Sequence, residues 1–136
     1  MPSVRLEKAY GPTRREVMKG LRAYNAGFMG KIDFRPMALT VRDEGRIVGG
    51  LVAETYLGWM FVSLLWLSEK YRGKDWGRSL MKAAETEARK RGVHHVYLDS
   101  FSFQAPGFYK KLGYREFGRL KDFPRGHDRV WLTKAL

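Results

Sequence analysis

Hydrophobic and polar residues alternate through the middle of the chain in the pattern of β-strands. The stretch MALTVRDEGRIVGGLVAETY, residues 37–56, contains two alternating runs on either side of Asp43–Gly45, which predicts a hairpin with a tight turn. The next run, WMFVSLLWL at residues 59–67, is almost wholly apolar, as expected for a strand in the centre of a sheet. The pattern therefore predicts three consecutive strands between residues 37 and 67.

Helical periodicity is present on both sides of these three strands. Thr13 and Glu16 have the spacing of a capping box, and the apolar residues within 17–24 then lie on one helical face. A second apolar helical face runs from Leu80 to Ala88, and Gly92 ends that pattern. We therefore expect one helix before the three strands and another after them.

Weaker patterns extend the series towards both ends of the chain. Val4–Tyr10 alternates weakly, which predicts a strand before the first helix. The later elements are a strand at 93–100, a short helix at 104–113, and strands at 114–120 and 129–136. This order of elements predicts an α/β domain in which helices flank a mixed sheet, and we expect residues 1–136 to form that single domain.

Composition narrows the class of protein. A chain of 136 residues has room for one core, because domains typically contain about 100–150 residues. With no cysteine, a disulfide framework, a thiolate nucleophile and a thiolate metal site are excluded. The apolar runs are shorter than the about 20 residues that cross a bilayer, and the first ten residues lack the pattern of a secretion signal. We therefore expect a soluble, cytoplasmic protein without a membrane segment.

The charge of the chain points to anionic ligands. The formal net charge is +12 and the isoelectric point is about 10.2, which predicts attraction to nucleic acid, acidic proteins or a phosphorylated cofactor. The basic residues are spread along the chain and are not interleaved with aromatic residues on one face, which disfavours nucleic acid. A nucleic-acid-binding or ribosome-associated basic domain nevertheless stays as an alternative.

The stretch LWLSEKYRGKDWGRSLM, residues 65–81, has the composition of an anion site. A strand leads through a basic loop with glycines into a helix N-terminus, where free amide N–H groups and the side chains of Arg72, Lys74 and Arg78 are available to bind phosphate. The loop has neither the GK[ST] ending of a P-loop nor a GxGxxG pattern. An ordinary loop with solvated arginines is the alternative.

This loop resembles the signature [RQ]xxGx[GA] of the GNAT superfamily of acyl-CoA-dependent N-acetyltransferases. Arg72 fills the first position and Gly77 the last, while Asp75 stands where a glycine is usual. Downstream, SFQAPGFYKKLGY is similar to the family pattern NxxAxxFYxxLGF, with Ser102 in place of the asparagine. The two motifs occur in the family's order and on the expected elements, and the resemblance covers roughly residues 59–136.

The resemblance implies a GNAT-like fold with a seven-stranded mixed sheet that splays between its fourth and fifth strands to bind acetyl-CoA. The strand backbone at 65–67 would pair with pantetheine, and the amide N–H groups of 73–78 would bind the pyrophosphate. Because only its backbone is needed, we expect the Asp75 carboxylate to turn away from the phosphates. The cofactor-binding residues so implied are Leu65, Trp66, Leu67, Arg72, Gly73, Lys74, Asp75, Trp76, Gly77, Arg78, Ser79, Ser102, Phe108 and Tyr109.

Acetyl transfer from a thioester to an amine needs a neutral amine, a stabilised oxyanion and a proton for the leaving thiolate. The resemblance assigns the proton to Tyr109, which could instead be a core aromatic residue. At the family's usual position of a glutamate base this chain has Phe61. Glu54 is our first candidate for the general base and Asp99 the second. A structural role for either carboxylate, and a water chain to backbone carbonyls, stay open.

The remaining polar residues suggest neither a metal nor a hydrolase. Adjacent His94 and His95 point to opposite faces of a strand, so no set of residues has metal spacing and we expect no metal. The lone His127 lies in the loop between the last two strands, which borders the acceptor site in the family. No serine has the GxSxG context of a nucleophile.

The function that the resemblance implies is transfer of acetyl from acetyl-CoA to a primary amine of a small molecule through a tetrahedral intermediate. Because the basic chain would repel a polycation, a weakly charged or zwitterionic amine is favoured. A protein of this fold that only senses acyl-CoA is a further alternative to the enzyme. Dimers are common in the family, so a homodimer is also expected.

Overall fold

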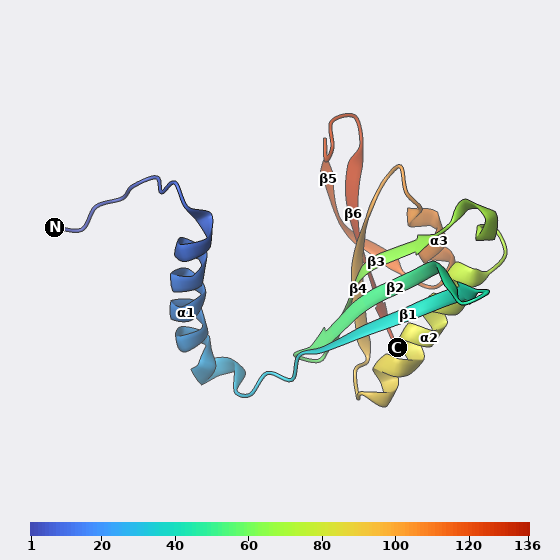
Figure 1. Ribbon diagram of the computed structural model, residues 1–136, viewed down its shortest axis with the longest axis horizontal. Helices are drawn as coiled ribbons and strands as arrows, with labels where there is room; N and C mark the ends of the chain where they lie inside the picture. Colours follow the sequence, from blue (N-terminus) through green and yellow to red (C-terminus); the bar gives the residue numbers. More distant parts are fainter. The chain divides into compact units, whose positions relative to one another are not determined.

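The computed structural model describes residues 1–136 and contains two compact units, Met1–Ile32 and Asp33–Leu136. The elements of both are labelled in Figure 1. No helix is long and apolar enough to cross a membrane. The smaller unit contains one helix, and the larger unit contains the sheet.

The smaller unit is built around helix α1, Tyr10–Met29, none of whose residues is buried. The helix begins before the predicted capping box. Thr13 Oγ1 donates a hydrogen bond to Ala9 O at 3.4 Å and caps no amide. The predicted strand at Val4–Tyr10 is not formed, so this expectation was wrong. Its alternation is weak, and residues 4–9 have no strand neighbour to pair with their backbone groups.

The larger unit contains a six-stranded mixed sheet of order β1-β2-β3-β4-β6-β5. The resemblance implied seven strands, and the difference is the N-terminal strand that does not form. The strands are β1 Arg35–Asp43, β2 Arg46–Tyr56, β3 Trp59–Leu67, β4 His95–Phe101, β5 Arg115–Lys121 and β6 Asp128–Ala135. All neighbouring pairs are antiparallel except β3 and β4, which run parallel.

Two tight turns join the first three strands, and the first lies at Asp43–Gly45, where the sequence predicts it. The turn after β1 places Glu44 and Gly45 at φ 50° and 77°, and the turn after β2 places Leu57 and Gly58 at φ 52° and 83°. Positive φ at both central residues is the type I′ geometry, whose twist matches that of antiparallel strands. Glycine takes this conformation without strain, which accounts for a glycine in the second position of each turn.

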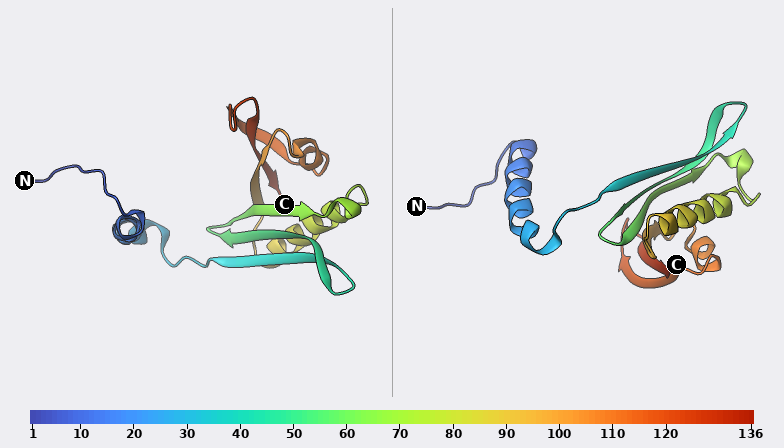
Figure 2. Two further views of the ribbon diagram at one scale, coloured as in Figure 1. Left: turned by 45° about the horizontal axis from the view of Figure 1, so that its top comes forward. Right: turned by 90° about the horizontal axis from the view of Figure 1, so that it is seen from below.

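The core lies between one face of the sheet and helix α2, Trp76–Lys90 (Figure 2). Met81 and Ala84 on the helix are fully buried, as are Ala53 and Met60 on the sheet. Burying a methionine side chain completely stabilises a fold by about 1.5–3 kcal/mol. The predicted apolar face of Leu80–Ala88 is therefore confirmed as the contact surface of this helix.

One charged residue lies inside this packing. Glu85 of α2 is 5% exposed; it accepts hydrogen bonds from Tyr114 Oη at 2.8 Å and from Lys134 Nζ at 2.9 Å. Burial, followed by the hydrogen bond to Glu85, raises the pKa of Tyr114. This network ties α2 to the C-terminal part of the sheet, where a buried carboxylate without partners would be costly.

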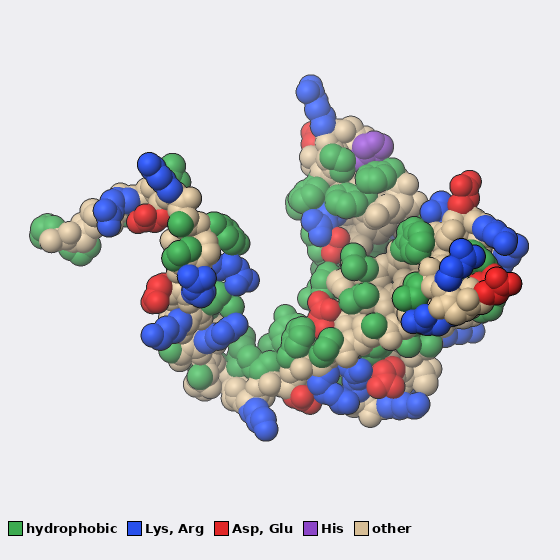
Figure 3. Space-filling view, viewed as in Figure 1, with side chains coloured by type: hydrophobic (Ala, Val, Ile, Leu, Met, Phe, Trp, Pro, Cys, Tyr) green, Lys and Arg blue, Asp and Glu red, His purple; other side chains and the backbone are tan.

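The elements after β3 complete the unit. A 3₁₀ turn, η1 Glu69–Tyr71, follows β3, and a short helix, α3 Pro106–Lys111, follows β4. Tyr71 Oη donates a hydrogen bond to Asp43, which connects the segment after β3 to the first hairpin. Lys and Arg side chains are scattered across the surface seen in Figure 3 and form no single stripe.

Candidate functional site

The parallel strands β3 and β4 separate soon after they meet. They pair only from Met60 to Val62 on β3 and from Val96 to Leu98 on β4, although β3 stays paired with β2 as far as Leu67. The β4-facing edge of residues 63–67 therefore has no strand partner. The splay predicted between the fourth and fifth strands is present between β3 and β4, because the predicted N-terminal strand is not formed.

A cavity of about 700 Å³ occupies this gap. Residues 62–67 of β3 form one wall and residues 99–101 of β4 form another, while Phe108 and Tyr109 of α3 and Arg129 of β6 complete it. A second cavity of about 450 Å³ is lined by residues 65–67 and by the loop that leads into α2. The two cavities share lining residues, so the gap between the strands continues to the glycine loop.

The loop Arg72–Asp75 leads into α2 with its amide groups free. None of the N–H groups from Gly73 to Arg78 donates to a backbone carbonyl, and the first intrahelical bond is made by Ser79 N to Asp75 O at 3.0 Å. Free N–H groups at a helix N-terminus attract anions, and the helix dipole adds to the attraction. This part of the site therefore fits a phosphate group.

Asp75 is the residue immediately before α2. Its φ of 67° is left-handed, and its side chain makes no capping hydrogen bond to the helix. The Asp75 side chain therefore does not occupy the N–H groups in the first turn of α2. That the Asp75 carboxylate turns away from bound phosphates stays a prediction.

The basic side chains of the loop differ in their contacts. Arg72 Nε donates to Leu67 O at 2.9 Å, which fastens the loop to the end of β3. Lys74 and Arg78 are exposed and form no ion pair. They are therefore available to an anionic ligand.

Gly77 allows α2 and α3 to approach each other closely. A Cβ atom at this position would lie 3.2 Å from Phe108 Cζ and 3.6 Å from Leu67 Cδ1. The contact with Phe108 is tighter than most Cβ contacts, whereas the contact with Leu67 is an ordinary one. The last glycine of the loop motif is therefore explained by its packing against Phe108 of α3.

Tyr109 lies on α3 with its ring against those of Phe108 and Tyr114, at centroid distances of 5.1 and 6.1 Å. Burial, and secondly the negative charge of Asp99, raise the pKa of Tyr109 to about 12. The hydroxyl is therefore protonated at neutral pH. Because it lines the larger cavity, it is a proton donor facing that space.

Asp99 and Arg129 form an ion pair in the same cavity. Arg129 Nε and Nη2 both lie close to Asp99 Oδ1, at 2.8 and 2.7 Å. The side chains are 16% exposed for Asp99 and 29% for Arg129. Arg129 also lies over three aromatic rings, which hold its guanidinium in place.

The two candidate bases lie in different places. Glu54 of β2 is opposite Phe61 of β3 and does not line the cavity. Asp99 does line it, together with Tyr109. The structure thus places Asp99 in one cavity with Tyr109, the candidate proton donor, and leaves Glu54 outside that cavity.

The other sequence candidates have structural contacts. Ser102 Oγ accepts the amide of Asp128 at 2.9 Å, which fixes the loop after β4 to the start of β6. His127 packs edge-on against Phe103 at 5.0 Å, and His95 stacks on Trp59 at 4.8 Å. No group of three or more His, Asp or Glu residues is placed to hold a metal ion.

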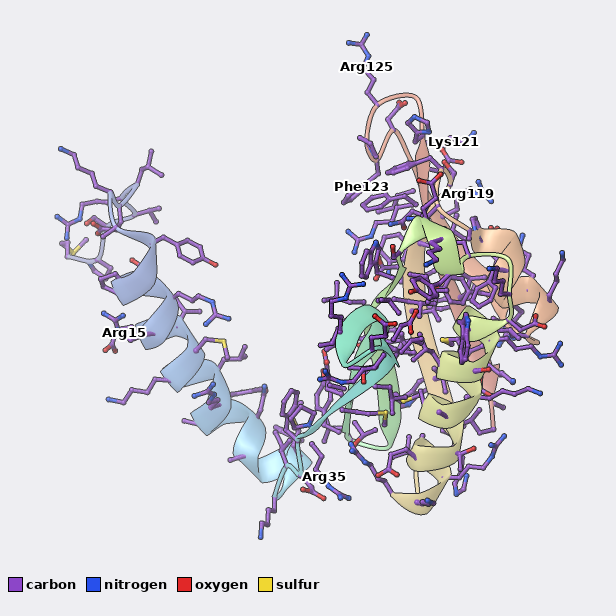
Figure 4. All side chains as sticks on the ribbon, turned by 45° about the vertical axis from the view of Figure 1, so that its right-hand side comes forward. Arg15, Arg35, Arg119, Lys121, Phe123 and Arg125 are labelled. Atoms are coloured by element: carbon purple, nitrogen blue, oxygen red, sulfur yellow. The ribbon has the colours of Figure 1, made fainter.

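Arg129 is the residue of this site that the sequence did not single out. No motif surrounds it, and it is 30 residues from Asp99 along the chain. The pairing of β4 with β6, which places Phe101 opposite Arg129, brings the two together. Figure 4 shows the adjoining β5–β6 hairpin, with Arg125 projecting from its tip and Arg119 and Phe123 nearer the sheet.

Comparison with known proteins gives consistent matches. The model of the Acetyltransferase (GNAT) family matches residues 6–114. An acetyltransferase of Agrobacterium fabrum is 37% identical over 117 residues, which is 85% of each chain. The blasticidin-S acetyltransferase of Streptomyces morookaense is 37% identical over 95 residues, 69% of this chain and 70% of that protein. A crystal structure of an acetyltransferase from Bacillus cereus has 33% identity, 98% coverage of each chain and a TM-score of 0.91.

Proposed function

Because the chain belongs to the GNAT family of acetyltransferases, we propose that it transfers the acetyl group of acetyl-CoA to a primary amine of a small molecule. One observation carries the proposal. The cavity between β3 and β4 is lined by the half-buried Tyr109 and continues to a loop of free amide N–H groups. A thioester with a phosphorylated carrier needs both features.

The donor is held by main-chain groups. The pyrophosphate of CoA binds the N–H groups of residues 73–78. The side chains of Lys74 and Arg78 add positive charge to this site. Pantetheine lies along the unpaired edge of residues 65–67 and completes the sheet as an added strand. The separation of β3 from β4 beyond Val62 and Leu98 supports this placement, because the edge is already free.

The reaction needs two proton movements. The amine nitrogen forms a bond to the acetyl carbon through a tetrahedral intermediate, the carbon–sulfur bond breaks, and Tyr109 gives its proton to the sulfur. Before the attack, a cationic amine gives one proton to Asp99, which passes it to solvent. After the attack, the nitrogen loses a second proton, which restores Tyr109. The raised pKa of Tyr109, caused first by burial, keeps the donor protonated at working pH.

We assign the role of general base, which accepts a proton from the amine, to Asp99 in preference to Glu54. It lines the cavity beside Tyr109, whereas Glu54 lies outside it. Asp99→Asn should lower kcat by roughly 10²-fold, the usual range for loss of a general base. Glu54→Gln, the matched control, should leave kcat within about twofold. The reverse result would return the role to Glu54.

The size of the cavity supports a small acceptor. About 700 Å³ is within the range of small-molecule sites. The Streptomyces relative is named for blasticidin S, a small molecule. The identity of the amine does not follow from that name.

Two other functions would give different results. An acyl-CoA sensor would bind acetyl-CoA and turn over no amine, and a nucleic-acid-binding domain would bind oligonucleotides at low salt with no response to acetyl-CoA. The formal net charge of +12 is the feature that favours the second function, and the scatter of the basic residues over the face seen in Figure 3 disfavours it.

The test is thiol release from acetyl-CoA with a panel of small amines. Wild type should release thiol with at least one amine, and Tyr109→Phe should reduce kcat by about 10²- to 10³-fold with little change in acetyl-CoA affinity. Tyr24→Phe, at a tyrosine that does not line the cavity, is the control. Full activity in Tyr109→Phe would remove this residue from the mechanism. A cytoplasmic location and a homodimer stay predictions.

A further inference from the structure

Arg129 is held in a fixed orientation by its surroundings. Its guanidinium carbon lies 5.4 Å from the centroid of Phe101, 4.9 Å from that of Phe123 and 5.0 Å from that of Trp131. Contacts of this kind between a cation and aromatic faces are attractive. Three rings restrict where the guanidinium can move, so it is ordered before any ligand arrives.

The ion pair with Asp99 uses only part of the hydrogen-bonding capacity of each partner. Both contacts from Arg129, through Nε and Nη2, go to the same oxygen, Asp99 Oδ1. A guanidinium has five N–H groups, and Arg129 Nη1 donates to no protein atom. Asp99 Oδ2 accepts no hydrogen bond from the protein either. Each residue therefore keeps a free charged edge.

Both residues line the cavity that contains Tyr109, and both are less than one-third exposed. An arginine can satisfy both oxygens of a carboxylate by two parallel bonds, and Arg129 does not do so here. Here the two partners instead offer a free acceptor and a free donor in one half-buried space. That arrangement is complementary to a molecule carrying a positive and a negative group.

We propose that Asp99 and Arg129 form the acceptor subsite and select a zwitterionic amine, a small molecule that carries a carboxylate near its reacting nitrogen. Arg129 Nη1 binds the carboxylate, and Asp99 Oδ2 binds the amine and accepts its proton. This inference rests on the proposed acetyl transfer and specifies the acceptor of the same site. Arg129 acts as a specificity residue and takes no part in bond making.

The proposal also explains how a basic protein tolerates an amine. The formal net charge of +12 repels cations, but a zwitterion has no net charge to repel. Its carboxylate gains from Arg129, and its ammonium group meets the carboxylate of Asp99. A singly charged cation of the same size gains only the second contact.

The experiment compares pairs of acceptors that differ in one group. Glycine, β-alanine, γ-aminobutyrate and a series of L-amino acids are each assayed beside their primary amides, with thiol release as the readout. Hydrogen bonds to a charged group are strong enough to predict a preference of about tenfold or more in kcat/KM for the acid of the best pair.

Two arginine variants locate the cause of that preference. Arg129→Gln should reduce the ratio of acid to amide to near one, by lowering kcat/KM for the acid while acetyl-CoA affinity is kept. Arg119→Gln is the matched control, since Arg119 is also ion-paired, to Glu116 and Asp128, but does not line the cavity. The control should keep the wild-type ratio.

The outcomes separate this inference from the proposed function. An equal or reversed ratio in wild type, an unchanged ratio in Arg129→Gln, or no turnover of any zwitterion by a protein that binds acetyl-CoA would overturn the inference. Failure to bind acetyl-CoA would instead overturn the proposed function. Loss of stability in Arg129→Gln is checked by its thermal midpoint, and Arg129→Lys, which keeps the charge, should retain part of the preference.

Discussion

Asp75 combines an unfavourable backbone conformation with an unfavourable charge. Its φ is 67°, where glycine is usual, and it adjoins the free N–H groups that we assign to pyrophosphate. Aspartate is among the residues that tolerate this conformation best. The substitution therefore keeps the shape of the loop while adding a negative charge beside an anion site.

Removing that charge should strengthen cofactor binding. Asp75→Asn keeps the tolerance for left-handed φ, and we expect its Kd for acetyl-CoA to fall about three- to tenfold at low salt, since an exposed charge a few ångströms away contributes about 1 kcal/mol. Isothermal titration at two salt concentrations would measure this. Asp122→Asn, at the other left-handed aspartate (φ 56°), is the control and should change nothing. Weaker binding by Asp75→Asn would mean that the carboxylate helps the loop.

Tyr109 should make the stability of the protein depend on pH in the alkaline range. Its pKa is raised to about 12 in the folded protein, by burial first, while an unfolded tyrosine ionises near about 10. The contribution is fully present below about pH 10 and is lost as the pH rises towards about 12, because the unfolded chain then releases the proton more readily. The loss should reach about 2–3 kcal/mol.

Urea unfolding at several alkaline pH values would measure this loss. Tyr109→Phe should flatten the pH dependence of the free energy of unfolding relative to wild type between about pH 10 and 12. Tyr24→Phe, in the smaller unit, should follow the wild-type curve. Equal slopes for wild type and Tyr109→Phe would show that the tyrosine is not protected from ionisation by the fold.

At the scale of elements, α2 is anchored to the sheet by a buried charge as well as by its apolar face. Glu85→Ala leaves Lys134 without its partner and should lower the free energy of unfolding by about 3–5 kcal/mol. Glu87→Ala, on the same helix, removes a carboxylate that is 36% exposed, and Arg91 keeps its hydrogen bonds to Arg35 O and Thr55 Oγ1. It should cost about 1 kcal/mol or less. Denaturant titration compares the two, and similar losses would contradict the anchoring role.

The elements themselves were largely predictable, for reasons that differ between them. The glycines at 45 and 58 mark turns whose backbone few other residues adopt easily, and the spacing of Leu80–Ala88 matches a helix packed on one side. Val4–Tyr10 was not predictable in the same way. Its weak alternation is compatible with a strand, but pairing requires a neighbour that local pattern does not reveal.

The site was predictable where a motif marks it and unpredictable where the sheet assembles it. The loop at 72–77 and Tyr109 lie in short local patterns. Asp99 contacts Arg129 only because β4 and β6 pair with one particular register. Glu54 lies outside the cavity because the register of β2 with β3 places it opposite Phe61. Strand register follows from packing of the whole sheet, so neither position could be read from spacing.

At the scale of the whole molecule, the net charge of +12 is compatible with several anionic partners, and the fold decides among them. Basic side chains are scattered, whereas free amide groups are gathered at one loop beside one cavity. Scattered charge steers anions in general, and a defined loop binds one kind of group. We therefore infer that acetyl-CoA is the ligand of that loop.

A thermal-shift titration with acetyl-CoA tests this claim most directly, because a ligand that binds only the folded state must stabilise it. At about 100 times Kd the stabilisation is about 2.7 kcal/mol, which for a domain of this size corresponds to a rise of roughly 5–15 °C in the midpoint. We predict this rise for the full chain. We predict a smaller rise for Gly77→Val, because the added side chain would push α2 away from α3. No shift at millimolar acetyl-CoA would contradict the account.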